Sequence, residues 1–441
     1  MSVAIIELND AGICCVNDRG DLTVSPGYAL LTPEGITTGE AALQRAYLEP
    51  QQSFNQYWWQ LNLSPLPVTS KHARHYADMA YAQLLALHRD SGHPEQVVFA
   101  VPGSFDRGQL SILLGLAKAS PFEATGLVDA AVAAASHADA TGTLVHLDIQ
   151  LHQTVITRLD VAQQIERTGV EIISNVGLKA FHDLWAQQIA NQFIRQYRYD
   201  PLHTAAGEQQ LYNRLPVWLS ALQGQAEITA ELDSPQGHYR LVLSRTELLA
   251  SSASRFQLLQ SKLSDLKTNG ETLLLSHRAA QLPGIREQLA PFATLDENAT
   301  ITGCRHHLEV ITGDPENLHF ITRLPCKPVA TGTATATASE QTYEPEPQPD
   351  ATLSKASAAA THLLYRHRAY AIGNRLAITR DGDQLRFTQS AGGDCCLVRE
   401  QDSVQLRTES SAVTVEGDPA DLRAGDSLQI DGDQLDLIEV T

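Results

Sequence analysis

"TLVHLDIQLHQTVITRL", residues 143–159, predicts two adjacent β-strands joined by a polar turn. Apolar and β-branched residues alternate with polar ones before Gln150 and after Gln153, as in half-buried strands. No glycine occurs between Gly142 and Gly169, so every residue of the turn carries a β-carbon. Because glycine is the residue that allows close approach to a turn's backbone, a ligand is not expected to rest on this one.

The sequence around this hairpin alternates between strand and helix patterns. Short apolar runs separated by Asn, Asp and Gly predict a meander of strands over 2–31, and a further buried strand is predicted over 96–105. Apolar residues at helical spacing predict helices over 70–93, 107–119 and 180–197. A mixed α/β domain is therefore expected.

Residues 273–289, "LLLSHRAAQLPGIREQL", predict a buried strand, a turn and an amphipathic helix. The turn opens with Ser276, His277 and Arg278. In α/β proteins, a turn that enters a helix often binds an anion through backbone N–H groups, and glycines allow the close approach. The bulky residues here raise the question of whether such a turn still binds a ligand.

Composition limits the classes of function. The chain has 441 residues, enough for two or three domains. Acidic residues outnumber basic ones by 51 to 32, for a formal net charge of −19, which disfavours nucleic acid and anionic membranes as partners. The sequence shows neither a signal-peptide pattern nor a membrane-length apolar run, so a cytoplasmic location is expected. The six cysteines lack zinc-ligand spacing and are expected to be reduced.

A change in composition at 327–358 separates two domains. This stretch is rich in Thr, Ala, Pro and Glu and has few large apolar residues, which predicts a flexible linker. It leaves one domain over 1–326 and another over 359–441. Short strand patterns recur through the second domain between Gly and Asp turns and predict a small all-β sandwich.

Five segments of the first domain carry a resemblance to a known family. They are "GEAALQRAYLEPQQSFNQYWW" (39–59), "VFAVPGSFDRGQLSILLGLAKA" (98–119), "NVGLKAFHDLW" (175–185), "LLLSHRAAQLPGIREQL" (273–289) and "DENATITGCRHHLEVITGD" (296–314). Together, in this order, they resemble the nucleotide-binding domain of Hsp70 chaperones, within the actin-like ATPase superfamily. Gly303 stands where the family's last segment has its glycine. The resemblance implies a two-lobed actin/Hsp70-like ATPase fold over 1–326.

The resemblance also implies where a nucleotide would lie. In this family, ATP sits between the lobes with its phosphates on two hairpin turns, where carboxylates hold Mg²⁺. The first turn, D-L-G-T-T in the family, aligns with Glu7, Asn9 and Asp10. The second turn, D-L-G-G-G-T in the family, aligns with Asp148 and the glycine-free residues 149–153. Their side chains would occupy the space that the phosphates need.

The other family contacts are replaced as well. Gly177 keeps one glycine of the family's L-G-G turn, and Ser276 and His277 stand in place of its adenosine-side G-G pair. The phosphate-binding lysine falls on or near Tyr57. The positions aligned with the adenine-binding helix are Pro216, Leu219 and Ser220. The cleft is therefore interpreted as vestigial, with candidate residues Glu7, Asn9, Asp10, Asp148, Gly177, Ser276 and His277.

The second domain resembles the forkhead-associated (FHA) β-sandwich. "YAIGNRLAI" is similar to its opening strand, and "VTVEGDPADLRAGDSLQIDGDQLDLIEV" is similar to its closing stretch. Asn374 stands where the family's phosphate-binding arginine is expected, and Glu416, Asp418 and Asp421 are acidic residues near the same region. Acidic side chains repel a phosphate, so phosphopeptide binding is disfavoured.

These observations predict a non-catalytic scaffold or adaptor, a pseudo-ATPase with an Hsp70-like domain and an FHA-like domain, both binding protein partners. No catalytic residue, metal site or cofactor is expected, and neither nucleic acid nor membrane is an expected partner. The alternative is a divergent Hsp70-like chaperone or ATPase that binds ATP or ADP with Mg²⁺ and hydrolyses ATP weakly. Glu7 and Asp148 would then be the candidate Mg²⁺ ligands.

Overall fold

In a computed structural model, the chain divides into two compact units, Met1–Thr333 and Ala334–Thr441. The structure describes residues 3–68, 70–136, 138, 141–266, 271–314 and 318–326 of the first unit. In the second unit it describes 360–365, 368–373, 375–381, 384–388, 395–400, 403–408, 413–416, 422–423, 426–430 and 433–438. The predicted linker, 327–358, lies outside the described residues. None of the helices in the described part of the chain has the length and apolar character needed to cross a membrane.

Two six-stranded sheets form the framework of the first unit. The first sheet contains, from edge to edge, β16 (Phe320–Ile321), β8 (Glu123–Asp129), β7 (Gln96–Val101), β1 (Val3–Glu7), β2 (Ile13–Val16) and β3 (Leu22–Ser25). The second contains β15 (Ala293–Thr294), β14 (Thr272–Leu275), β9 (Gly142–Ile149), β10 (Gln153–Val161), β11 (Gln164–Ser174) and β17 (Arg323–Pro325). Both are mixed sheets, which confirms the α/β class.

The two sheets repeat one topology around their central strands. In the first sheet, β1 pairs antiparallel with β2 and parallel with β7, and β3 and β8 extend the sheet on either side. In the second sheet, β9 pairs antiparallel with β10 and parallel with β14, and β11 and β15 extend it in the same way. The turn that follows β1 and the turn that follows β9 are therefore equivalent positions.

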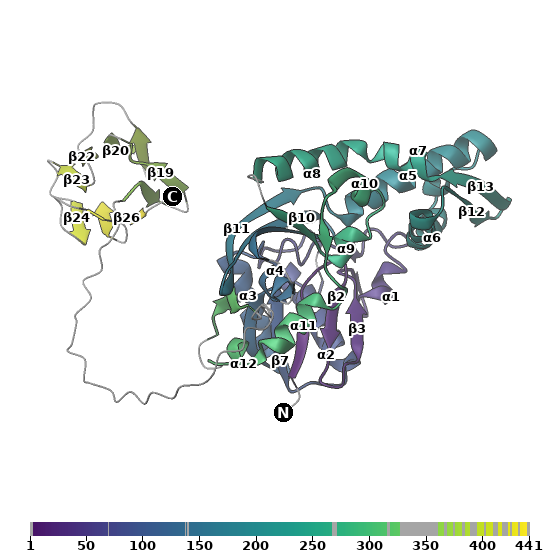
Figure 1. Cartoon of the computed structure of the whole chain (residues 1–441), viewed down its shortest axis with the longest axis horizontal. Helices are drawn as coiled ribbons and strands as arrows, with labels where there is room; N and C mark the ends of the chain where they lie inside the picture. Colours follow the sequence, from purple (N-terminus) through teal and green to yellow (C-terminus); the bar gives the residue numbers. More distant parts are fainter. Residues whose placement is uncertain are drawn as a thin grey trace, which may run out of the picture. The chain divides into compact units, whose positions relative to one another are not determined.

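Helices cover the outer faces of both sheets and fill the layer between them (Figure 1). The helices of the first unit are α1 (Glu40–Leu43), α2 (Tyr76–Asp90), α3 (Arg107–Ala119), α4 (Ala130–Ala135), α5 (Leu178–Tyr197), the 3-10 helix η1 (Pro201–His203), α6 (Ala205–Gly224), α7 (Arg245–Ser251), α8 (Ala253–Leu266), α9 (His277–Ala280), α10 (Ile285–Leu289), α11 (Ala299–His306) and α12 (Leu308–Ile311). Helices α2 and α3 pack on the first sheet, and α5, α6 and α8 pack on the second.

Helices α4 and α11 contribute to the apolar cluster shared by the two sheets. Gly303 allows their close contact, because a β-carbon there would lie 1.9 Å from the carbonyl oxygen of Ala133. The close contact between the two helices therefore explains why residue 303 is a glycine, and no ligand is needed to explain it.

Two small sheets complete the first unit. They are β5 (Gly35–Thr38), β4 (Ala29–Thr32) and β6 (Ser53–Phe54), and the hairpin β12 (Glu227–Ser234) with β13 (Gly237–Ser244). The predicted strands and helices are present at 96–101, 107–119 and 178–197, and the predicted hairpin at 143–159 is β9 and β10. The stretch 273–289 differs from its prediction, because α9 already begins at His277, where Ser276 caps it by accepting a hydrogen bond from Ala279 N. The expected turn is thus helical.

In the described residues of the second unit, every regular element is a strand. One sheet contains β19 (Arg368–Ala371), β18 (His362–Tyr365), β26 (Asp433–Ile438), β25 (Ser427–Ile430) and β24 (Val413–Glu416). The other contains β21 (Gln384–Thr388), β20 (Arg375–Asp381), β22 (Cys395–Glu400) and β23 (Ser403–Thr408). Leu363 and Leu397, from different sheets, belong to one buried cluster. Asn374, Asp418 and Asp421 lie outside the described residues.

Candidate functional site

Acidic residues of the two equivalent strands converge between the sheets. Ile5 of β1 and Leu144 of β9 belong to the apolar cluster between the sheets. Because side chains alternate along a strand, Glu7, His146 and Asp148 lie on that same inner face. All three line one small space of about 20 Å³, enough for about one water molecule.

An arginine occupies the position next to Glu7. Arg278 donates from its two terminal nitrogens to the two carboxylate oxygens of Glu7, each at 3.1 Å. The same guanidinium donates to the carbonyl oxygen of Gly12 at 3.1 Å. Thr300 donates from its hydroxyl to Glu7 Oε1 at 3.0 Å. The side chains of Glu7 and Arg278 are only 9% and 13% exposed, so this bidentate pair is largely removed from water.

The Glu7 carboxyl group is ionised despite its burial. Burial alone would raise its pKa, but Arg278 and the Thr300 hydroxyl outweigh burial and hold the pKa below its ordinary value. Burial alone would lower the pKa of Arg278, but the Glu7 carboxylate raises it further above its ordinary value. The protein therefore supplies its own cation at the carboxylate where the family resemblance implied Mg²⁺.

Two side chains of the first turn (residues 8–12) bind the end of β9 and the second turn (residues 150–152) directly. Asn9 donates from Nδ2 to Asp148 Oδ2 at 2.8 Å and to the carbonyl oxygen of Ile149 at 3.0 Å. Asp10 accepts a hydrogen bond at Oδ1 from Leu151 N at 2.7 Å. Asn9 and Asp10 are both buried. Direct hydrogen bonds of Asn9 and Asp10 thus join the first turn to the end of β9 and to the second turn.

Burial perturbs the other ionisable groups of this region. It raises the pKa of Asp10 to about 7; the hydrogen bond from Leu151 opposes this shift, and the neighbouring Asp148 charge adds to it. Burial also raises the pKa of Asp148 and lowers that of His146 to about 4, so His146 is neutral at physiological pH. His146 Nε2 and Asp148 Oδ1 have no hydrogen-bond partner among the described residues.

The side chains of the second turn are packed into the protein. Leu151 joins a buried cluster with Tyr28 and Leu30. His152 stacks on Trp59 with ring centroids 5.3 Å apart, and its Nε2 is 2.8 Å from the carbonyl oxygen of Asn55. These contacts agree with the expectation that side chains fill the bend.

Gly177 serves this packing. It caps the N-terminus of α5, where Leu178 N donates to the carbonyl oxygen of Gln150 at 2.8 Å and Lys179 N donates to that of Leu151 at 2.9 Å. The N–H groups at a helix N-terminus are common anion ligands. Here the second turn uses two of them.

Replacing Gly177 with alanine should destabilise the protein. The new β-carbon would lie 2.4 Å from both Gln153 N and the carbonyl carbon of His152. Such overpacking against backbone is expected to lower the free energy of unfolding by about 1 to 3 kcal/mol in urea titrations. The matched control is Gly115→Ala in α3, where a β-carbon would meet open space and should stabilise by about 0.5 to 1 kcal/mol. Equal effects at both positions would contradict the packing role of Gly177.

A second set of contacts joins α1 and its following residues to α6. Gln209 of α6 accepts at Oε1 from Tyr47 N at 2.9 Å and donates from Nε2 to the carbonyl oxygen of Leu43 at 3.0 Å. Tyr47 stacks on Tyr212, with ring centroids 3.9 Å apart. Tyr212 in turn donates its hydroxyl to Asp183 Oδ1 at 2.7 Å. These contacts therefore form a second connection within the first unit, at residues other than Glu7 and Arg278.

The remaining candidates have structural roles. Ser276 N donates to the carbonyl oxygen of Leu147 at 2.9 Å, which fixes the start of α9 beside β9. His277 lines the same small space as Glu7 and Asp148, and burial lowers its pKa. Tyr57 is fully buried and donates its hydroxyl to Gln83 Oε1 at 2.6 Å. Leu219 packs in the apolar cluster of the second sheet.

Sequence reasoning missed the residues that complete this arrangement, chiefly Arg278, Thr300 and Gln209. Arg278 lies 271 positions from Glu7, so no local pattern reports their contact. The charge of Glu7 was the one signal in the sequence, because a carboxylate at the end of a buried strand requires a nearby cation or several hydrogen-bond donors.

The residues present do not fit Mg²⁺ and a triphosphate. The guanidinium of Arg278 lies against Glu7, the two turns bind each other, and the space lined by Glu7, Asp148 and Arg278 is about 20 Å³. Among the described residues, no group of three or more His, Cys, Asp or Glu side chains is placed to hold a metal ion. No protein-family model and no curated protein sequence matches the chain.

Proposed function

We propose that the first unit has a two-lobed actin/Hsp70-like fold and acts as a non-catalytic scaffold whose nucleotide cleft is closed by its own side chains. The repeated topology of the two sheets supports this fold, because the two turns that would hold phosphates occupy equivalent positions. The bidentate ion pair between Arg278 and Glu7 is the main observation that supports the proposed loss of nucleotide binding.

The proposed scaffold binds protein partners through both units. A net charge of −19 favours neutral or basic partner surfaces. The second unit, which we propose is FHA-like, would contribute a contact surface without phosphopeptide recognition. Cross-linking of the full chain in extracts of its native cells should yield cross-links from both units to one assembly. Cross-links from one unit alone would contradict the adaptor role. The cytoplasmic location stays a prediction.

Calorimetric titration with Mg-ATP tests the closed cleft. No saturable heat is expected at ATP concentrations up to about 1 mM, because binding would require breaking the buried ion pair and separating the two turns. Phosphate release should equal that of a buffer blank. Micromolar binding, or release that disappears in Asp148→Ala, would overturn the proposal in favour of a divergent ATPase.

A further inference from the structure

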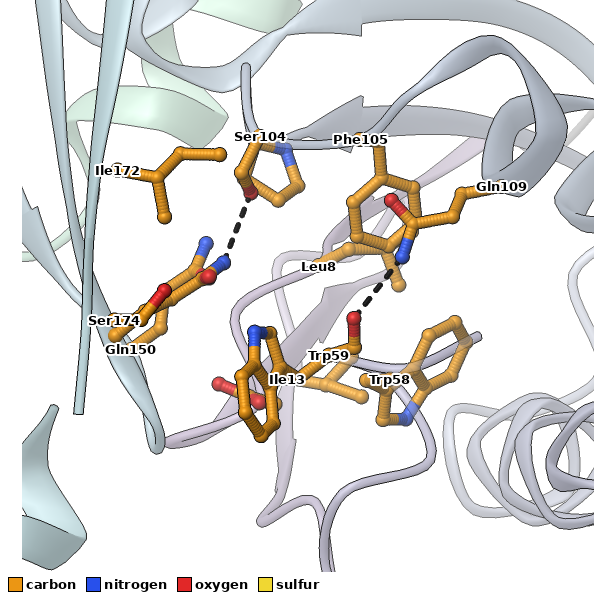
Figure 2. Close-up of a pocket in the computed structure, with 13 residues that line it drawn as sticks. Leu8, Ile13, Trp58, Trp59, Ser104, Phe105, Gln109, Gln150, Ile172 and Ser174 are labelled. Atoms are coloured by element: carbon orange, nitrogen blue, oxygen red, sulfur yellow. Dashed lines mark hydrogen bonds between the residues drawn. The ribbon is translucent and has the colours of Figure 1, made fainter. Parts of the chain in front are cut away.

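A separate cavity of about 240 Å³ lies beside the two turns. Its walls include the aromatic side chains of Trp58, Trp59 and Phe105, and its polar groups include Asp10, Ser104 and Gln150. Figure 2 shows Trp58 and Trp59 facing Ser104 and Phe105 across the cavity, with Gln150 and Ile172 along one side. An apolar cavity of about 150 Å³ is enough to bind benzene, so this one has room for an aromatic ring with a small polar substituent.

Gln150, a residue of the cavity wall, carries a buried hydrogen-bond donor without a partner among the described residues. Its side chain is 4% exposed, and its Oε1 accepts a hydrogen bond from Gln153 Nε2 at 2.7 Å. Its Nε2 has no hydrogen-bond partner among the described residues. A buried N–H group without a partner costs free energy, and a ligand carbonyl oxygen would remove that cost. The donor is thus the group that would orient a ligand.

The charge of the cavity wall limits the ligand class. None of the described residues that line it is basic, whereas Asp10 is acidic and 5% exposed. A carboxylate or phosphate would therefore meet a nearby negative charge with no cation to offset it. An uncharged carboxamide can accept from Gln150 through its oxygen and donate towards Asp10 through its N–H groups.

We propose that this cavity binds a small, uncharged aromatic carboxamide between Trp59 and Phe105, oriented by Gln150. The cavity shares Asp10 and Gln150 with the two turns, but its ligand carries no phosphate and does not displace Arg278.

Ligand-detected NMR with benzamide tests the proposal on the full chain. Benzamide is expected to bind with a Kd of about 0.1 to 1 mM, as suits so small a ligand. Benzoate, which has nearly the same shape, should bind at least about tenfold more weakly at pH 8 because both it and Asp10 are then ionised. No benzamide binding at about 10 mM, or equal binding of benzoate, would overturn the proposal.

Two variants assign the binding to this cavity. Gln150→Met keeps the volume of the side chain but removes the donor, and should weaken benzamide about tenfold while leaving toluene binding unchanged. Ile172→Trp fills the rim at a residue that is 44% exposed, so the fold should tolerate it and both ligands should be lost. Unchanged benzamide binding in both variants would contradict the assignment, and loss of toluene binding in Gln150→Met would contradict the role of its donor.

Discussion

Replacement of Arg278 with methionine should lower the free energy of unfolding by about 3 to 5 kcal/mol, because it leaves Glu7 buried without a cation. Urea titration at pH 7 measures this loss. The difference between wild type and variant should narrow as the pH falls through 4.5 towards the lowered pKa of Glu7, below which Glu7 is protonated in both proteins and no longer needs the guanidinium. The sign follows from the lowered pKa of Glu7, whose stabilising contribution is present above its unfolded-state value of 4.5 and is lost on acidification.

The matched control is Arg240→Met. Arg240 also pairs with a glutamate, Glu231, at 2.9 Å, but its side chain is 68% exposed. A solvent-exposed pair contributes at most about 1 kcal/mol, so this variant should unfold at nearly the wild-type urea concentration. Similar losses in the two variants would show that the interaction between Arg278 and Glu7 has no special role in joining the two sheets.

Replacement of Asp10 with asparagine should stabilise the protein at pH 8 by about 2 to 4 kcal/mol, since asparagine avoids the cost of a buried negative charge. Asparagine also keeps a side-chain oxygen that can accept the hydrogen bond from Leu151 N. The folded-state pKa of Asp10 is raised to about 7 from an ordinary value of 3.8. Its carboxyl group therefore reduces wild-type stability progressively as the pH rises from about 4 to about 7.

The measurement is a pair of urea titrations at pH 4 and pH 8. The two proteins should differ little at pH 4, where Asp10 is protonated in the folded state, and should differ fully at pH 8. The control is Asp160→Asn, at an exposed residue of β10, which should change stability by less than about 0.5 kcal/mol at both values. If Asp10→Asn had a lower free energy of unfolding than wild type at pH 8, the ionised carboxylate of Asp10 would not reduce stability as predicted.

Much of the first unit could be predicted from periodic features of the sequence. Alternation along 143–159 predicted β9 and β10, and helical spacing predicted α3 and α5, because each pattern reports which side of an element is buried. The hairpin of β12 and β13 and the helices α7 and α8 were not predicted. Much of their apolar surface packs on α5 and its neighbours, which local sequence does not reveal.

The candidate site was only partly predictable. Glu7, Asn9, Asp10 and Asp148 lie at the two equivalent turns, where the motif comparison expected them, and the structure brings them together. The identity of their partners depends on residues far along the chain. Gln209 contacts Tyr47 across 162 positions, and neither residue has a pattern that would indicate the other. Contacts of this kind follow from the tertiary arrangement alone.

The segment 320–325 has a mechanical consequence. Its strands β16 and β17 belong to different sheets and are separated by Thr322, whose carbonyl oxygen accepts a hydrogen bond from Arg167 N at 2.9 Å. A pulling force applied to the chain beyond Pro325 would therefore act first on the ladder between β17 and β11, and then on the pairing of β16 with β8. Tension on the chain beyond Pro325 would therefore load the second sheet before the first.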